Sequence, residues 1–114
     1  MYALIVVLNA IDYLDDVLDG FVKLGISGAT ILDSQGMGSA IVNSDYRNIS
    51  LFSSLNKLLS DSHPYSKTIF TVLETEAMVE KAVAVVQEAV DGISSTGVGF
   101  MFTIPIGKIY QINP

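Results

Sequence analysis

The sequence has no cysteine and no tryptophan, and it contains one histidine, three prolines and six basic residues among 114 positions. Without cysteine, disulfides and thiolate metal sites are excluded. Six basic residues spread along the chain cannot build a stripe that follows a phosphate backbone, so we expect no nucleic acid partner. The single His63 cannot form an ordinary zinc site, because such sites need several histidine or cysteine ligands.

A long hydrophobic run is also absent. The longest unbroken run of aliphatic residues extends only from Ala3 to Leu8, whereas a membrane-spanning helix needs about 20 residues. The amino-terminal residues carry neither the basic leader nor the small-residue cleavage site of a signal peptide. We therefore expect a cytoplasmic protein with no direct membrane insertion.

Apolar residues make up 50% of the chain, and acidic residues outnumber basic ones to give a formal net charge of −6. The length predicts a single domain over residues 1–114. The high apolar and low charged content excludes intrinsic disorder. Because a small domain has much surface per residue, this apolar excess indicates surface that is buried in an oligomer.

The spacing of apolar residues predicts alternating strands and helices. Strands are expected at 3–8, 28–33, 67–73 and 100–104, with a short edge strand at 109–112, and helices at 11–24, 48–60 and 76–91. Gly25 and Gly92 stand where helices should end, and Thr75 stands where one should begin. Residues 34–39, which follow the second predicted strand, predict a flexible turn. The alternative is a loop whose backbone amides bind an anion.

This order predicts an α+β fold, a ferredoxin-like βαββαβ sandwich with an extra helix between strands 2 and 3. Two helices would cover one face of the four-stranded sheet, and the other face would be bare and apolar. The extra helix at 48–60, or other copies of the sheet, would cover that face. The apolar side of this helix itself has three candidate partners: its own sheet, a neighbouring subunit, or a membrane or partner protein.

Candidate catalytic groups are few. The carboxylates of the first helix, which share one arc, indicate either a hard cation site or, as we prefer, a solvated outer face: Asp12, Asp15, Asp16 and Asp19. His63 lies in a turn beside Pro64, and no Gly-x-Ser-x-Gly elbow is present. Glu74 and Glu76 are explained by a helix start. We therefore predict a binding or regulatory module and not an enzyme.

Two segments resemble a known family. Gly25-Ile26-Ser27-Gly28-Ala29-Thr30-Ile31, followed by Gln35-Gly36-Met37-Gly38, is similar to the region of nitrogen regulatory PII proteins that leads into their T-loop. Thr96-Gly97 and the strand from Gly99 to Ile106 resemble the family's B-loop and its following strand. The resemblance implies a homotrimer that senses nucleotides in clefts between subunits. It also implies signal transduction to a protein partner, such as a membrane transporter or an enzyme.

The resemblance carries a set of candidate ligand-binding residues onto this chain: Thr30, Gly36, Met37, Gly38, Thr96 and Gly97. Other positions depart from the family. Its glutamine after the Gly-x-Gly turn aligns with Ala40, its B-loop lysine with Phe100, and its two carboxyl-terminal arginines with Gln111 and Asn113. The T-loop is shortened and accompanied by the extra helix, so the chain resembles a divergent member.

Each departure removes a polar or cationic contact to phosphate. An acidic protein also repels anions at long range. The family's sensing of ATP and 2-oxoglutarate is therefore not expected to carry over unchanged, although an adenine nucleotide or a related small molecule is the ligand that the resemblance implies. The alternative is a structural or adaptor trimer without a ligand, and a small enzyme working in the inter-subunit clefts is the least favoured of the three.

Overall fold

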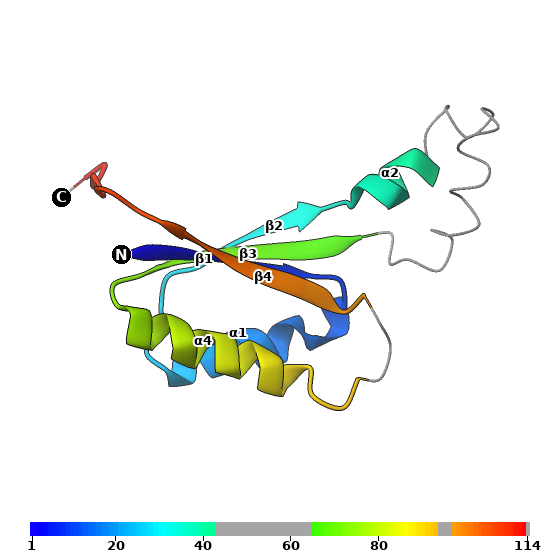
Figure 1. The fold of residues 1–114 in the computed structure, drawn as a ribbon, viewed down its shortest axis with the longest axis horizontal. Helices are drawn as coiled ribbons and strands as arrows, with labels where there is room; N and C mark the ends of the chain where they lie inside the picture. The colour runs from blue at the N-terminus through cyan, green and yellow to red at the C-terminus, as the bar shows by residue number, and fades with distance from the viewer. Residues whose placement is uncertain (43–64, 94–96, 114) are drawn as a thin grey trace.

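The computed structural model describes residues 1–42, 65–93 and 97–113. Within these ranges the chain forms one antiparallel sheet with two helices on one side (Figure 1). The predicted helix at 48–60, together with Tyr46, His63 and Thr96, lies outside the described residues. Within them, no helix combines the length and hydrophobicity that crossing a membrane requires.

Four strands follow one another in the sheet in the order β2-β3-β1-β4. They are β1 (Tyr2–Leu8), β2 (Thr30–Ser34), β3 (Ser66–Leu73) and β4 (Gly99–Pro105). β1 is central because its short run of β-branched and aliphatic residues can be covered on both faces. The order and the antiparallel pairing confirm the predicted ferredoxin-like arrangement.

Two helices pack side by side below the sheet (Figure 1). A short 3₁₀ turn, η1 (Ile11–Tyr13), leads into α1 (Leu14–Lys23), and Gly25 follows with φ of 85°. The second helix is α4 (Glu76–Ala89), which begins where the Met78 backbone N–H donates to Thr75 Oγ1 over 3.1 Å. Gly92 follows α4 with φ of 89°, so both predicted helix stops are confirmed.

The alternation of side chains along β1 and β3 places the core between sheet and helices. β1 sends Leu4, Val6 and Leu8 toward the helices, where Val17 and Phe21 of α1 meet them. The other buried apolar side chains come from the α1–β2 connection, β3 and α4: Ile26, Ile69, Leu73, Val79, Ala82 and Val86. Asp12 of η1 and the three aspartates of α1 are all exposed, as the solvated-face interpretation predicts.

The opposite face of the sheet is apolar and, among the described residues, carries no covering helix (Figure 1). We call it the open face. The strand register lines up its side chains in three rows: Leu32, Thr68, Val7 and Phe100; Thr30, Phe70, Ile5 and Phe102; Val72, Ala3 and Ile104. The rings of Phe100 and Phe102 stack with centroids 6.1 Å apart, and these side chains are 61% and 44% exposed.

Two local predictions are wrong. The turn expected at 34–39 ends early, because a short helix, α2 (Met37–Val42), begins inside it. The Ala40 N–H donates to the Gly36 carbonyl over 3.0 Å, which closes the first turn of this helix. Neither Gly36 nor Gly38 is among the glycines with positive φ. The glycines there therefore do not serve an unusual backbone shape.

The edge strand expected at 109–112 is also absent from the described chain. After β4, the Ile106 N–H donates to the Met1 carbonyl over 3.0 Å, and the segment then leaves the sheet. Ile109, Tyr110 and Ile112 are exposed. Apolar residues at strand-like spacing form a strand only when a neighbouring strand can pair with them, and no such neighbour is present here within the described residues.

Gly20 of α1 marks a close approach to α4. A Cβ atom at this position would lie 2.3 Å from Val85 Cγ1. Gly20→Ala should gain about 1 kcal/mol of helix propensity but lose about 1–3 kcal/mol to overpacking. We expect a net loss of up to about 2 kcal/mol in urea unfolding, and recovery in the Gly20→Ala/Val85→Ala double variant. Equal losses in the single and double variants would contradict this contact.

Candidate functional site

A pocket of about 400 Å³ opens at the end of the sheet where β3 passes into α4. It lies between two connections, one joining α1 to β2 and the other joining β3 to α4. We call it the Glu74 pocket. Its lining residues are Gly25, Ile26, Ser27, Gly28, Thr71, Val72, Leu73, Glu74, Thr75 and Met78. Its volume falls within the range of small-molecule sites, and its wall combines apolar side chains with backbone and hydroxyl groups.

Local packing holds the walls of the Glu74 pocket in place. Ile26 is buried, and its N–H donates to the Phe21 carbonyl over 2.9 Å, which ties the α1–β2 connection to the helix. Two residues later, the Gly28 carbonyl accepts a hydrogen bond from the Thr71 hydroxyl of β3. Thr71 is buried between Ile69 and Leu73 on the same face of β3. Its hydroxyl is satisfied by this bond, which also fixes the opposite wall of the pocket.

The charge of the Glu74 pocket is negative. Glu74 is the only ionisable residue among those that line it. The positive end of the α4 dipole lies next to it, but Thr75 already accepts the Met78 N–H and Glu76 occupies the first turn. The pocket thus presents a carboxylate, hydroxyls and backbone groups, without a cationic side chain from the described chain.

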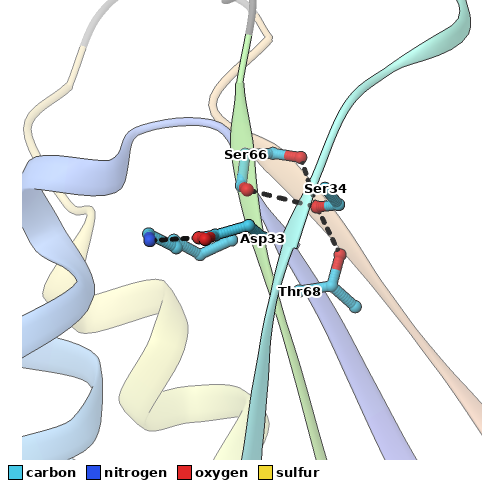
Figure 2. Close-up of polar contacts among 5 residues, drawn as sticks. Asp33, Ser34, Ser66 and Thr68 are labelled. Atoms are coloured by element: carbon cyan, nitrogen blue, oxygen red, sulfur yellow. Dashed lines mark hydrogen bonds and ion pairs between the residues drawn. The ribbon is translucent and has the colours of Figure 1, made fainter.

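A polar cluster closes the other end of the β2–β3 pair (Figure 2). The Ser34 hydroxyl lies 2.7 Å from that of Ser66 and 2.8 Å from that of Thr68, on the open face. Asp33 forms an ion pair with Lys67 on the helix side of the same strands. Because Ser34 and Ser66 are the last paired residues, these contacts fix the points where residues 35–65 leave and rejoin the sheet.

A second pocket, of about 250 Å³ and mostly apolar, lies between β4 and the end of α4. Gly99, Phe100 and Met101 of β4 line it together with Val86 and Val90 of α4. Just before it, the Asn9 side-chain amide donates to the Gly97 carbonyl over 2.9 Å. The region that resembles a B-loop therefore lies at the end of the sheet where β1 ends and β4 begins.

The sequence-predicted site residues do not form one cluster in a single chain. Thr30 begins β2, and Ser34 ends it about 13 Å further along at strand spacing. Gly36, Met37 and Gly38 lie beyond Ser34. Gly97 lies at the same end of the sheet as Gly36, but β2 and β4 are opposite edges, about 14 Å apart at the usual strand separation. Thr96 lies outside the described residues.

Sequence reasoning did not assign Thr71 or Glu74 to a binding site. Thr71 belongs to β3, and Glu74 follows the last residue of this strand. The two residues come close to the α1–β2 connection only because β2 and β3 pair in the sheet. One signal was present, because Thr71 interrupts the alternation of apolar residues between Ile69 and Leu73. A polar residue at a core position needs a partner, and here that partner is a carbonyl in the wall of the pocket.

The sheet order, the helices on one face and the Glu74 pocket define a ferredoxin-like α+β protein with room for a small molecule. A family model described as "Nitrogen regulatory protein P-II" matches residues 1–114. The chain therefore belongs to the nitrogen regulatory protein P-II family, and the resemblance found in the sequence is confirmed.

A solved structure shares this fold. PII from Arabidopsis thaliana, in a crystal structure bound to citrate, matches with a TM-score of 0.68 and 17% sequence identity. The match covers 97% of this chain and 81% of the Arabidopsis chain. At this identity the likeness concerns the fold alone. No protein with a curated description matches the sequence.

Proposed function

We propose that this chain is a cytoplasmic, homotrimeric signalling protein of the PII type, which binds a small-molecule effector in clefts between subunits and acts on a protein partner. Membership of a regulatory family supports this role over that of an enzyme. The observation that carries the proposal is the open face, whose exposed Phe100, Phe102 and Ile104 would be costly to leave in water. Packing of three such faces around an axis would bury them.

The separation of the candidate residues also supports clefts between copies. Thr30 and Gly36 lie at the β2 edge of the sheet, whereas Gly97 lies at the β4 edge. A second copy of the chain is therefore needed to bring the β2 edge of one copy close to the β4 edge of another. The Glu74 pocket lies next to the β2 edge and would contribute to such a cleft. An adenine nucleotide or related molecule is the proposed class of effector, and a membrane transporter or an enzyme is the proposed partner.

One observation favours the alternative of an adaptor trimer without an effector. The position that resembles the family's B-loop lysine is Phe100, which faces the open side of the sheet. A phenylalanine there contributes apolar surface for assembly and no contact for phosphate.

Light scattering and thermal shift separate these functions. The purified chain should have three times its monomer mass of 12.2 kDa, and a monomer would contradict the proposal. A panel of adenine nucleotides, adenosine, cyclic dinucleotides and 2-oxoglutarate should contain a member that raises the unfolding temperature. An effector at 100 times its Kd adds about 2.7 kcal/mol of stability. A trimer with no response, together with a tight partner recovered by pull-down, would favour the adaptor.

A further inference from the structure

We infer that the carboxyl-terminal segment 109–112 of one copy adds a strand to the β2 edge of the sheet in a neighbouring copy. The inference rests on the proposed homo-oligomer and goes beyond it, because it names the two segments whose backbones meet. It follows from three observations: an unprotected strand edge, an apolar segment without a partner, and a linker too short to join the two within one chain.

The β2 edge of the sheet is an open hydrogen-bonding surface. β2 pairs with β3 on one side only, so the N–H and C=O groups of every second β2 residue face outward without a partner strand in the described chain. Ile31 and Leu32 of β2 are exposed. Edge strands are usually protected by proline, lysine or a bulge. β2 contains none of these, and the charge of Asp33 is paired with Lys67.

The opposite edge, formed by β4, has a protection that β2 lacks. β4 ends at Pro105, and the next residue, Ile106, donates its N–H to the Met1 carbonyl on the side of β1. Because consecutive N–H groups alternate in direction along a strand, the nitrogen of Pro105 faces the outer edge, where it offers no donor. The following segment does not turn back along β4. Figure 1 shows that it projects beyond the sheet, away from α1 and α4.

The segment 109–112 has the composition of a strand but no strand to pair with in the described chain. Tyr110 is 80% exposed, and Ile112 is fully exposed. Beyond Ile106, no backbone N–H of residues 107–113 makes a hydrogen bond within the described residues. β-branched and aromatic side chains favour an extended, paired backbone. The segment therefore has the apolar side chains and the unbonded backbone groups that a strand pairing needs.

The segment cannot lie along the β2 edge of its own sheet. Ile106 is held beside Met1, and the two residues between Ile106 and Ile109 allow a span of about 10 Å. In the sheet order β2-β3-β1-β4, a strand added outside β2 lies four strand spacings from β4, which is about 19 Å. The β2 edge that receives the segment therefore belongs to a second copy.

The side chains of the two segments match when they are paired. Alternation places Tyr110 and Ile112 on one face of the added strand and Ile109 on the other. With Tyr110 beside Leu32, which lies on the open face, the added strand extends the apolar surface of that face. Ile109 then lies on the helix side of the sheet, as Ile31 does.

Engineered disulfides test the inference in a chain that has no cysteine of its own. Directly opposed residues on neighbouring strands have Cα atoms about 4.5–5.5 Å apart, a separation that a disulfide spans. After oxidation, Leu32→Cys/Tyr110→Cys should give covalently joined copies in denaturing electrophoresis without reductant. Thr30→Cys/Tyr110→Cys covers a pairing shifted by two residues, which keeps the same faces. Joined copies in either variant support the inference, and their absence from both would overturn it.

The matched control is Val22→Cys/Tyr110→Cys, which moves one cysteine to an exposed position on the helix layer. This variant should give no joined copies. The single variants Leu32→Cys, Thr30→Cys and Tyr110→Cys should also remain unjoined. If Tyr110→Cys alone gave as much joined product as the double variants, the link would connect two tails, and the assignment to the β2 edge would be wrong.

Hydrogen exchange measures the strand pairing itself. In the assembled protein, amides of residues 109–112 that face β2 should exchange about tenfold or more slowly than in an unstructured peptide of the same sequence, because they become hydrogen-bonded. Dilution to the monomer should remove this protection. Exchange at the unstructured rate in an intact oligomer would overturn the inference.

These outcomes are distinct from those that test the proposed function. A trimer by light scattering that shows neither joined copies nor protected amides would overturn the strand addition and leave the proposed assembly supported. A monomer would count against both.

Discussion

The Phe102→Glu variant should be a monomer at micromolar concentration, whereas the parent chain should be a trimer. Phe102 lies in the middle row of the open face, beside Ile5 and next to Phe100. In the proposed assembly, each copy would bury a carboxylate in an apolar interface without a partner. Loss of an aromatic anchor alone costs about 2–4 kcal/mol, which is a 30- to 1,000-fold weaker association. Light scattering over a dilution series measures this change.

The matched control is Val22→Glu, which adds the same charge on α1. Val22 is 68% exposed and lies on the helix layer, away from the open face, so this variant should keep the mass of the parent. Both variants should keep the parent's far-ultraviolet circular dichroism, because Phe102 and Val22 are exposed in the single chain. An unchanged mass for Phe102→Glu would show that the open face is not the contact between copies.

Gly99→Ala should be the most destabilising single-methyl addition in the described chain. Gly99 begins β4 with φ of 154°, and a Cβ atom there would lie 2.3 Å from the carbonyl oxygen of Val7. The obstacle is backbone of the central strand, which cannot move without disturbing the sheet on both sides. The unusual backbone conformation costs about 1–3 kcal/mol for a residue other than glycine, and the clash adds to it.

We expect a total loss of about 3 kcal/mol or more, measured by urea unfolding. Gly97→Ala is the comparison, because Gly97 also has a positive φ, of 79°, but a Cβ atom added there would meet nothing within 4 Å. Its loss should be about 1–2 kcal/mol, from backbone conformation alone. Similar losses for the two variants would mean that β4 can shift away from Val7 at little cost.

The sequence was sufficient to predict those parts of the fold that depend on a local pattern of residues. The helical spacing of apolar residues around Val17 and Phe21 predicted α1, and the apolar run from Ala3 to Leu8 predicted the central strand. Gly25, Gly92 and Thr75 marked element ends correctly, because each meets a local backbone requirement that does not depend on distant residues.

The sequence was insufficient to predict features that depend on contacts between segments far apart in the chain. Ile109, Tyr110 and Ile112 have strand-like spacing, but no strand in the described chain lies beside them. One difference was local: Met37 begins a helix although two glycines flank it, and the Ala40 N–H closes the first turn on the Gly36 carbonyl. The Glu74 pocket joins Gly28 to Thr71, and these residues meet only after β2 and β3 have paired.

The pairing of Ser34 with Ser66 has a consequence for how this fold varies. The two residues are directly opposite in the register, so residues 35–65 form a bridge between two paired points of the sheet. The hydroxyl cluster on one face and the Asp33–Lys67 ion pair on the other belong to the strands, not to that bridge (Figure 2). The ends of the two strands are thus held by contacts that do not involve the bridge. We therefore expect the length and composition of the bridge to tolerate change, by divergence or by design, while the β2–β3 pairing is preserved.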